Sequence, residues 1–191
     1  MDGEPLVPLG CLLLGLAAGT VGGVRMKSKP IQSAPGVEVF ELPGYEPLGM
    51  IGEDANGILY LARQVELDRL VAIRRLPTEL SHNRTFMRRF RQSAAGQSRL
   101  RHPNWAEVYA LRTHGAHAYL VTEFVEGALL RHVMKAAGRL TPEQALGVMS
   151  GVLKGLAHAH DLGLVNGALR PENVIVDTSG TSKLVDLGLC R

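Results

Sequence analysis

Residues 165–174 read Val165-Asn166-Gly167-Ala168-Leu169-Arg170-Pro171-Glu172-Asn173-Val174, and the interpretation of the fold depends on this stretch. A second short motif, Leu184-Val185-Asp186-Leu187-Gly188, follows it. Within the first stretch Ala168 carries only a methyl group, which can neither accept a proton nor orient a hydroxyl group. This position therefore cannot supply a general base.

The first stretch resembles the catalytic loop of protein kinases, His-Arg-Asp-Leu-Lys-Pro-Glu-Asn, and the second resembles their Asp-Phe-Gly motif with Leu187 in place of Phe. In the kinase loop the Asp receives the substrate hydroxyl proton, and the Asn holds a metal ion. Ala168 stands at the position of that Asp, and Arg170 at that of the Lys. The metal-binding positions are taken by Asn173 and Asp186. The resemblance thus implies a kinase frame without its catalytic base.

Three further kinase motifs occur earlier in the chain. Residues 52–57 resemble the glycine-rich loop between the first two strands, and residues 71–74 resemble the third strand, with Arg74 at the position of the phosphate-binding Lys. Residues 119–127 resemble the fifth strand and the hinge, with Thr122 as gatekeeper. The positions that the resemblance assigns to a nucleotide site are Gly52, Gly57, Leu59, Ala72, Arg74, Thr122, Glu123, Val125 and Arg170.

Helical patterns lie between these motifs. Residues 84–100 place Phe86 and Phe90 at helical spacing, and they resemble the αC helix of kinases. Residues 141–144, Thr-Pro-Glu-Gln, combine an N-cap, a proline at the first helical position and a capping-box glutamine. The apolar run from there to His160 predicts the αE helix below the catalytic loop.

The ordered motifs predict an α+β, protein-kinase-like fold similar to bacterial Ser/Thr kinases. It has a complete N-terminal lobe, an antiparallel sheet with the αC helix, and only the first part of the helical C-terminal lobe. An unrelated α+β domain would not place both late motifs at their proper separation. The expected parts are a tail (1–5), a transmembrane helix (6–24), a basic, proline-containing linker (25–43), the N-terminal lobe with the hinge (44–127) and a partial C-terminal lobe (128–191).

Several departures from the kinase pattern concern phosphate chemistry. Arg74 keeps a positive charge but not the compact shape of a Lys. Ser93 stands where the family has the αC Glu that pairs with this Lys, and no Asp or Glu occurs between Leu80 and Trp105. The ion pair typical of the active arrangement therefore has no acidic partner on the helix.

Asp54 replaces the middle glycine of the phosphate loop. A glycine allows the backbone to approach phosphate, whereas Asp adds bulk and a negative charge. Asp is equally an ordinary turn residue. Both interpretations stay open, and both weaken phosphate binding.

Asn173 and Asp186 leave room for a divalent cation, and the resemblance implies ATP and Mg²⁺ as cofactors that this chain does not require. The alternative is that Asn173 hydrogen-bonds only within the loop and Asp186 caps a turn. The replacement of the loop's His and Arg by Asn166 and Gly167 removes the group that would engage a phosphorylated activation loop.

Composition limits the partners. A net charge of +3 and 5% aromatic residues do not indicate nucleic-acid binding. With two cysteines, Cys11 and Cys190, a disulfide framework is not expected.

Residues 6–24 contain no charged side chain and are about as long as a membrane-spanning helix, for which roughly 20 residues are needed. The basic residues Arg25, Lys27 and Lys29 follow directly, so the positive-inside rule places the later domain in the cytoplasm. We therefore expect a single-pass protein of the plasma membrane. A cleaved signal peptide, or a lipoprotein signal ending at Cys11, fits less well because the chain begins with acidic residues.

Gly15, Gly19 and Gly23 lie four apart in this segment, which favours helix self-association or reflects the general frequency of small residues in membrane helices. The chain ends three residues after the Asp-Leu-Gly motif, so later kinase helices are absent and the apolar αE positions Leu146, Val152, Leu153 and Leu156 are expected to lack part of their cover.

The sequence favours a membrane-tethered pseudokinase that acts as a signalling scaffold or binding module with a protein partner. The alternatives are a weakly active ATP-dependent Ser/Thr kinase and a nonfunctional truncated relative.

Overall fold

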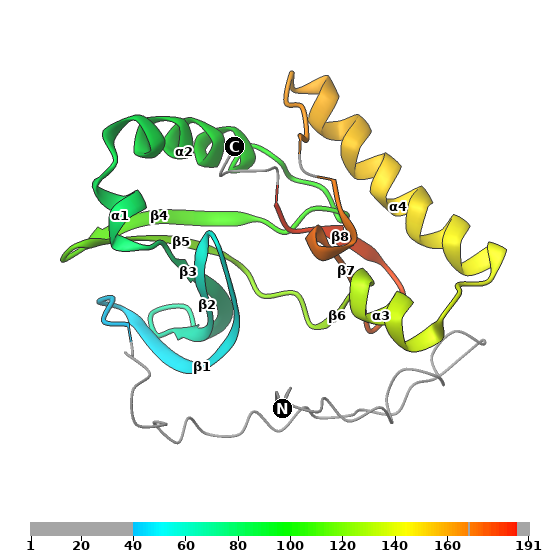
Figure 1. Ribbon diagram of the computed structural model, residues 1–191, viewed down its shortest axis with the longest axis horizontal. Coiled ribbons are helices and arrows are strands. Elements are labelled where there is room, and N and C mark those ends of the chain that lie inside the picture. Colours follow the sequence, from blue (N-terminus) through cyan, green and yellow to red (C-terminus); the bar gives the residue numbers. More distant parts are fainter. Residues whose placement is uncertain (1–39, 168, 187–191) are drawn as a thin grey trace.

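The computed structural model describes residues 40–167 and 169–186. Within them the larger sheet and the first two α-helices form one part of the molecule, and a second part contains the next two α-helices and a small sheet (Figure 1). The predicted transmembrane helix at 6–24, its glycine face and Ala168 lie outside the described residues. None of the described helices is both long and apolar enough to span a bilayer.

The larger sheet is antiparallel and contains five strands in the order β1-β2-β3-β5-β4. Its strands are β1 (Tyr45–Asp54), β2 (Gly57–Gln64), β3 (Arg69–Arg75), β4 (Val108–His114) and β5 (His117–Glu123). One face buries alternating apolar residues of β2, β3 and β5, including Tyr60, Ile73 and Val121. Alternation of this kind is expected where one face of a sheet is packed and the other carries different contacts.

The packed part of the chain includes the end of the predicted linker. Phe40 and Leu42 are buried against this same sheet face, and the Phe40 ring lies 4.9 Å from that of Tyr60 between centroids. The linker was expected to run to residue 43. Its last residues pack because two apolar side chains two positions apart can both reach the sheet.

Helix α2 (Arg84–Gln97) covers part of the other face, after the short helix α1 (Thr78–His82). Asn83 caps α2 by accepting a hydrogen bond from the Phe86 N–H, and Met87, Phe90 and Ala94 are buried against β4 and β5. The helix was predicted to reach Leu100. It ends earlier because the Leu100 N–H turns back to the Gln97 carbonyl and Leu100 joins the core of the second part.

The second part begins with β6 (Gly127–Leu129) and α3 (Leu130–Ala137) and continues into α4 (Pro142–Asp161), η2 (Pro171–Asn173), β7 (Val174–Asp177) and β8 (Ser182–Leu184). The predicted capping box is present: the Gln144 N–H donates to Thr141 Oγ1, and the Thr141 N–H donates to Gln144 Oε1. Strands β6, β7 and β8 form a small antiparallel sheet.

Residues 104–106 join the parts. Trp105 is 2% exposed, and its Nε1–H donates to the Gly155 carbonyl of α4 at 2.7 Å. Asn104 Nδ2 donates to the Ser182 carbonyl at 2.7 Å. A side chain at Gly155 would contact Asn104 and Trp105 at 3.2 Å, so the helix can approach this closely because it has none.

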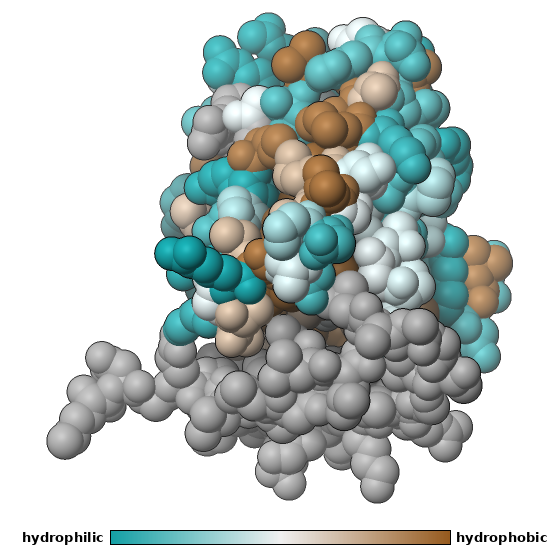
Figure 2. Space-filling view, turned by 90° about the vertical axis from the view of Figure 1, so that its right-hand side faces the viewer, coloured by the Kyte–Doolittle hydropathy of each residue, from teal (hydrophilic) through white to brown (hydrophobic). Residues whose placement is uncertain are grey.

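The outer side of α4 carries Leu146, Met149 and Leu153, which are 70%, 43% and 58% exposed. Figure 2 views the molecule from this side and shows hydrophobic patches among polar ones. Of the other positions expected there, Val152 is buried and Leu156 packs against the core. Val152 and Leu156 are four positions apart and lie on the packed side of the helix, whereas Met149 and Leu153, also four apart, lie on its outer side.

Candidate functional site

The hairpin between β1 and β2 contains both predicted glycines, and they differ in what the fold requires. Gly57 has φ +115°, and a Cβ there would lie 2.0 Å from the Arg75 carbonyl oxygen. Gly52 pairs with Leu59, and a Cβ there would meet nothing within 4 Å. The chain itself therefore demands glycine at position 57 and not at position 52.

Asp54, at the tip of this hairpin, forms an ion pair with Arg74 of β3. Arg74 Nη1 donates to Asp54 Oδ1 at 2.7 Å, and the same oxygen accepts the Asn56 N–H at 2.8 Å. Asp54 thus closes the turn and also places a negative charge on the predicted phosphate-binding cation. The role of Asp54 as a turn residue is confirmed, and its effect on phosphate binding stays a prediction.

Helix α2 supplies no such charge. Ser93 lies half-buried on it, and within residues 40–167 and 169–186 no ion pair links α2 to Arg74. Arg74 therefore has an acidic partner, but this partner comes from the hairpin. Sequence reasoning treated Asp54 and Arg74 separately and missed their pairing.

The predicted adenine-facing residues share one side of the large sheet. Ala72 lies opposite Thr122 on β5, Leu59 lies opposite Arg74, and directly opposed residues of an antiparallel pair point to the same face. Ile73 alternates with Ala72 and Arg74, so this face is the reverse of the one that contains the Tyr60 cluster. This face carries Leu59, Ala72 and Thr122 together with Arg74.

The hinge fits the same arrangement. Thr122 Oγ1 donates weakly to the Ala72 carbonyl at 3.4 Å, which directs the gatekeeper side chain toward β3. Val125 and Ala72 are each 8% exposed. The structure thus brings Leu59, Ala72 and Thr122 onto adjacent strands, with Val125 following β5 at the hinge.

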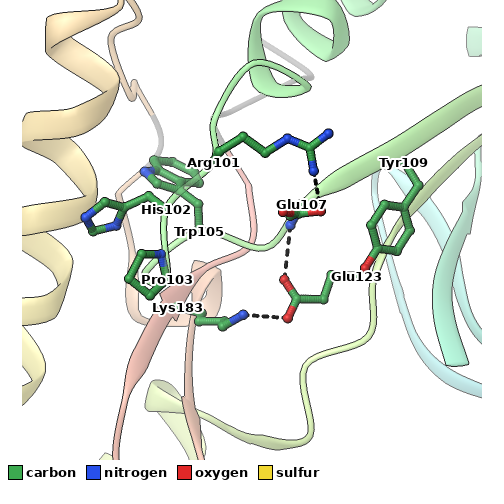
Figure 3. Close-up of a pocket in the computed structure, with 8 residues that line it drawn as sticks. All are labelled: Arg101, His102, Pro103, Trp105, Glu107, Tyr109, Glu123 and Lys183. Atoms are coloured by element: carbon green, nitrogen blue, oxygen red, sulfur yellow. Dashed lines mark hydrogen bonds and ion pairs between the residues drawn. The ribbon is translucent and has the colours of Figure 1, made fainter. Parts of the chain in front are cut away.

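Glu123 directs its carboxylate away from this face. It accepts from Lys183 Nζ at 2.5 Å and from the Glu107 N–H at 3.2 Å, while its own N–H donates to the Glu107 carbonyl at 2.8 Å. Figure 3 shows these contacts in a cavity of about 450 Å³. Its lining residues are Arg101, His102, Pro103, Trp105, Glu107, Tyr109, Glu123 and Lys183.

Two groups of this cavity have perturbed pKa values. Burial raises the pKa of Tyr109, opposed by the Arg69 guanidinium, which lies 3.6 Å over the ring. Burial lowers the pKa of His102, as do the charges of His158 and Lys154. The acids and bases around the cavity pair with one another, as in Arg101–Glu107 at 2.6 Å, so the cavity has no excess charge to attract a nucleotide.

The loop of residues 165–174 lies beside the segment that contains Asp186, so the two predicted metal positions, Asn173 and Asp186, are close together. The Asn173 carbonyl accepts the Val185 N–H at 3.0 Å, next to Asp186. Asn166 Nδ2 donates to the Asp186 carbonyl at 3.2 Å, a contact the sequence did not suggest. Arg170 precedes η2 and is exposed, and its carbonyl accepts the Asn173 N–H at 2.9 Å.

Asn173 and Asp186 provide an amide and a carboxylate oxygen, which are ligand types that Mg²⁺ accepts together with water and phosphate. Among the described residues no group of three or more His, Cys, Asp or Glu side chains is placed to hold a metal ion. The pair therefore fits a cation brought with a nucleotide better than one bound by the protein alone.

Comparison with known proteins agrees with this geometry. The family model "Protein kinase domain" matches residues 45–191. The serine/threonine-protein kinase PrkC of Bacillus subtilis is 37% identical over 145 residues, which are 76% of this chain and 22% of PrkC. PknL of Mycobacterium tuberculosis is 35% identical over 141 residues, 74% of this chain and 35% of PknL.

Solved structures give the same result. The crystal structure of the M. tuberculosis PknI kinase domain matches with a TM-score of 0.70 and 26% identity, over 77% of this chain and 59% of that domain. The chain thus spans about a fifth to a third of the curated relatives named here and about three fifths of the PknI domain.

Proposed function

The chain belongs to the protein kinase family, and from that premise we propose that it is a catalytically inactive member that acts as a binding or scaffolding module in signalling at a membrane. Its relatives are serine/threonine kinases, and the proposal concerns how this chain departs from them. A scaffold of this type needs the kinase shape but not phosphoryl transfer.

The observation that carries the proposal is Ala168 at the position of the catalytic base. In the kinase mechanism the Asp at this position accepts the proton of the substrate hydroxyl group. A positioned general base contributes about 10²- to 10⁴-fold to a rate. A methyl group contributes none of this.

The N-terminal lobe supports the same conclusion independently. The positive charge that would stabilise the nucleotide phosphates lies on Arg74, and this side chain already binds Asp54. No acid of α2 holds it in place, because Ser93 occupies that position. The charges needed to position a γ-phosphate are thus engaged elsewhere.

A weakly active Ser/Thr kinase is the second candidate, favoured by Asn173 and Asp186. The Val185–Asn173 backbone hydrogen bond keeps these two positions adjacent. They would hold Mg²⁺ when it arrives with ATP, and the metal would then neutralise charge on the phosphates. Leu59, Ala72, Thr122 and Val125 would form the walls for the adenine ring.

The membrane part of the proposal rests on residues 6–24 and the basic residues that follow them. A single span would keep the kinase-like domain on the cytoplasmic face of the plasma membrane. Gly15, Gly19 and Gly23 would allow two such helices to pack closely. Labelling of a cysteine introduced at residue 3 from outside intact cells tests this topology, and protection of that cysteine would contradict it.

Phosphoryl transfer by the purified full chain tests the central claim. Incorporation of the γ-phosphate of ATP into the chain itself and into a generic protein substrate is measured with Mg²⁺ and with Mn²⁺. We expect no incorporation above that of the Asp186→Ala variant, which lacks a metal position. Robust transfer by the wild type that disappears in Asp186→Ala would refute the inactive assignment and favour the second candidate.

A further inference from the structure

We propose that Asp54 competes with phosphate for Arg74. Because its carboxylate is paired with Arg74, the sheet face with Ala72 and Thr122 binds an adenine group more readily than the phosphate chain attached to it. This inference rests on the proposed function only in taking the sheet face with Ala72 and Thr122 as the adenine site. It adds a determinant of ligand selectivity to that site.

The position of Asp54 supports the competition. It ends β1, whereas Arg74 lies on β3, and β2 separates the two strands in the sheet. The carboxylate must therefore reach past β2 to Arg74, into the space below the hairpin tip. In the kinase arrangement this space holds the phosphates, between the glycine-rich loop and the basic residue of the third strand.

In the contact between Arg74 and Asp54, the carboxylate already binds the guanidinium group that would bind a phosphate. A guanidinium group binds carboxylate and phosphate oxygens with the same planar donors. While Arg74 Nη1 donates to Asp54 Oδ1 at 2.7 Å, a phosphate has to share the guanidinium with the carboxylate or displace it. The displaced charge would then repel the phosphate from a few ångströms away.

The pair is accessible enough for displacement. The Asp54 side chain is 50% exposed and that of Arg74 is 22% exposed. Exposed ion pairs contribute little net free energy because water and salt screen them. The competition should therefore reduce phosphate affinity without abolishing it.

The opposing explanation is that the Asp54–Arg74 pair only stabilises the hairpin, as a structural clasp. The two explanations predict different effects on ligand binding when the charge of Asp54 is removed. A clasp predicts that the hairpin loosens and every ligand of the cleft binds more weakly. A competitor predicts tighter binding of phosphate-containing ligands alone. The Asp54→Asn variant separates these predictions, because Asn keeps an oxygen that can accept the Asn56 N–H but loses the charge.

The test measures binding of ATP, adenosine and inorganic tripolyphosphate to the full chain by calorimetry at low salt. We expect Asp54→Asn to bind ATP and tripolyphosphate about threefold to fivefold more tightly than the wild type, with the affinity for adenosine unchanged. Added NaCl should reduce the difference, since it screens exposed charges.

The control is Asp68→Asn, which removes the same charge from the Arg63–Asp68 pair of the same sheet, at the β2–β3 turn. This variant should bind all three ligands like the wild type. Three results would each overturn the inference. The first is an equal change in both variants, and the second is weaker ATP binding in Asp54→Asn. The third is an ATP affinity that is the same in the wild type and Asp54→Asn, or too weak to detect in both. The binding assay requires no turnover, so its failure is distinguishable from the detection of kinase activity, which bears on the proposed function.

Discussion

Two groups of residues differ in how far they depart from the kinase pattern. One group would bind phosphate, and the other holds the two parts of the molecule together. In the first group, Asp54 binds Arg74, Ser93 leaves α2 without an acid, and Ala168 removes the base. In the second group, Trp105 Nε1–H donates to the Gly155 carbonyl of α4, and Asn104 Nδ2 donates to the Ser182 carbonyl of β8.

In this fold, the packing of the two parts and the binding of phosphate therefore depend on separate residues. Shape depends on buried backbone and aromatic contacts that any binding function also needs. Phosphate chemistry depends on a few partly exposed charges, which can change without loss of packing. The following predictions test how complete that separation is.

The largest effect is expected where the joining contacts are most buried. Trp105→Ala should lower the free energy of unfolding by about 3–5 kcal/mol, because it leaves a large cavity and removes the indole hydrogen bond to the Gly155 carbonyl. Urea denaturation measures this, with the exposed Val65→Ala as control. A loss below about 1 kcal/mol for Trp105→Ala would show that residues 104–106 do not hold the parts together.

A smaller effect is expected at the hinge. Lys183→Met keeps most of the aliphatic stem but leaves the partly buried Glu123 carboxylate without its cation, which should cost about 1–2 kcal/mol. Arg63→Met, in the more exposed pair with Asp68, should cost less than about 0.5 kcal/mol. Equal losses in thermal or urea unfolding would mean that the hinge pair is an ordinary surface contact.

Asn166→Ala removes the hydrogen bond to the Asp186 carbonyl and should cost about 1 kcal/mol. Local opening near Asp186 should increase, which amide hydrogen exchange of residues 183–186 would measure. Asn166→His supplies another donor and should restore part of the protection. If Asn166→Ala exchanges like the wild type, Asn166 does not position Asp186.

The smallest effect is a pH dependence. The lowered pKa of His102 means that the unfolded chain binds a proton more readily, so its stabilising contribution is present above its ordinary pKa of 6.5 and declines as pH falls below it. His102 Nδ1 also accepts the Asn104 N–H, which requires an unprotonated nitrogen. His102→Gln should reduce the fall in melting temperature between pH 7.5 and 5.5, and an unchanged fall would contradict this assignment.

Much of the fold could be predicted because its signals are local. Thr141 and Gln144 mark the start of α4 by their own hydrogen bonds, and residues 71–74, which resemble the third strand of kinases, lie in β3. The end of α2 could not be placed as well. It depends on Leu100 entering a core formed with residues far along the chain.

In the candidate site, positions were predictable and partnerships were not. The glycine-rich and hinge motifs placed Gly57, Ala72 and Thr122 on neighbouring strands, as found. The pairing of Asp54 with Arg74 depends on how far a hairpin tip reaches across the sheet. That of Glu123 with Lys183 joins residues 60 positions apart, which no local pattern encodes.

The close approach of Gly57 to the Arg75 carbonyl limits what a glycine in this loop indicates about nucleotide binding. Selection for a well-formed hairpin alone is enough to keep this glycine, even in a lineage that never again meets a nucleotide. In a saturation mutagenesis screen for folding alone, position 57 should tolerate almost nothing and position 52 almost everything. A preserved glycine at such a turn records the geometry of the chain and is silent about its ligand.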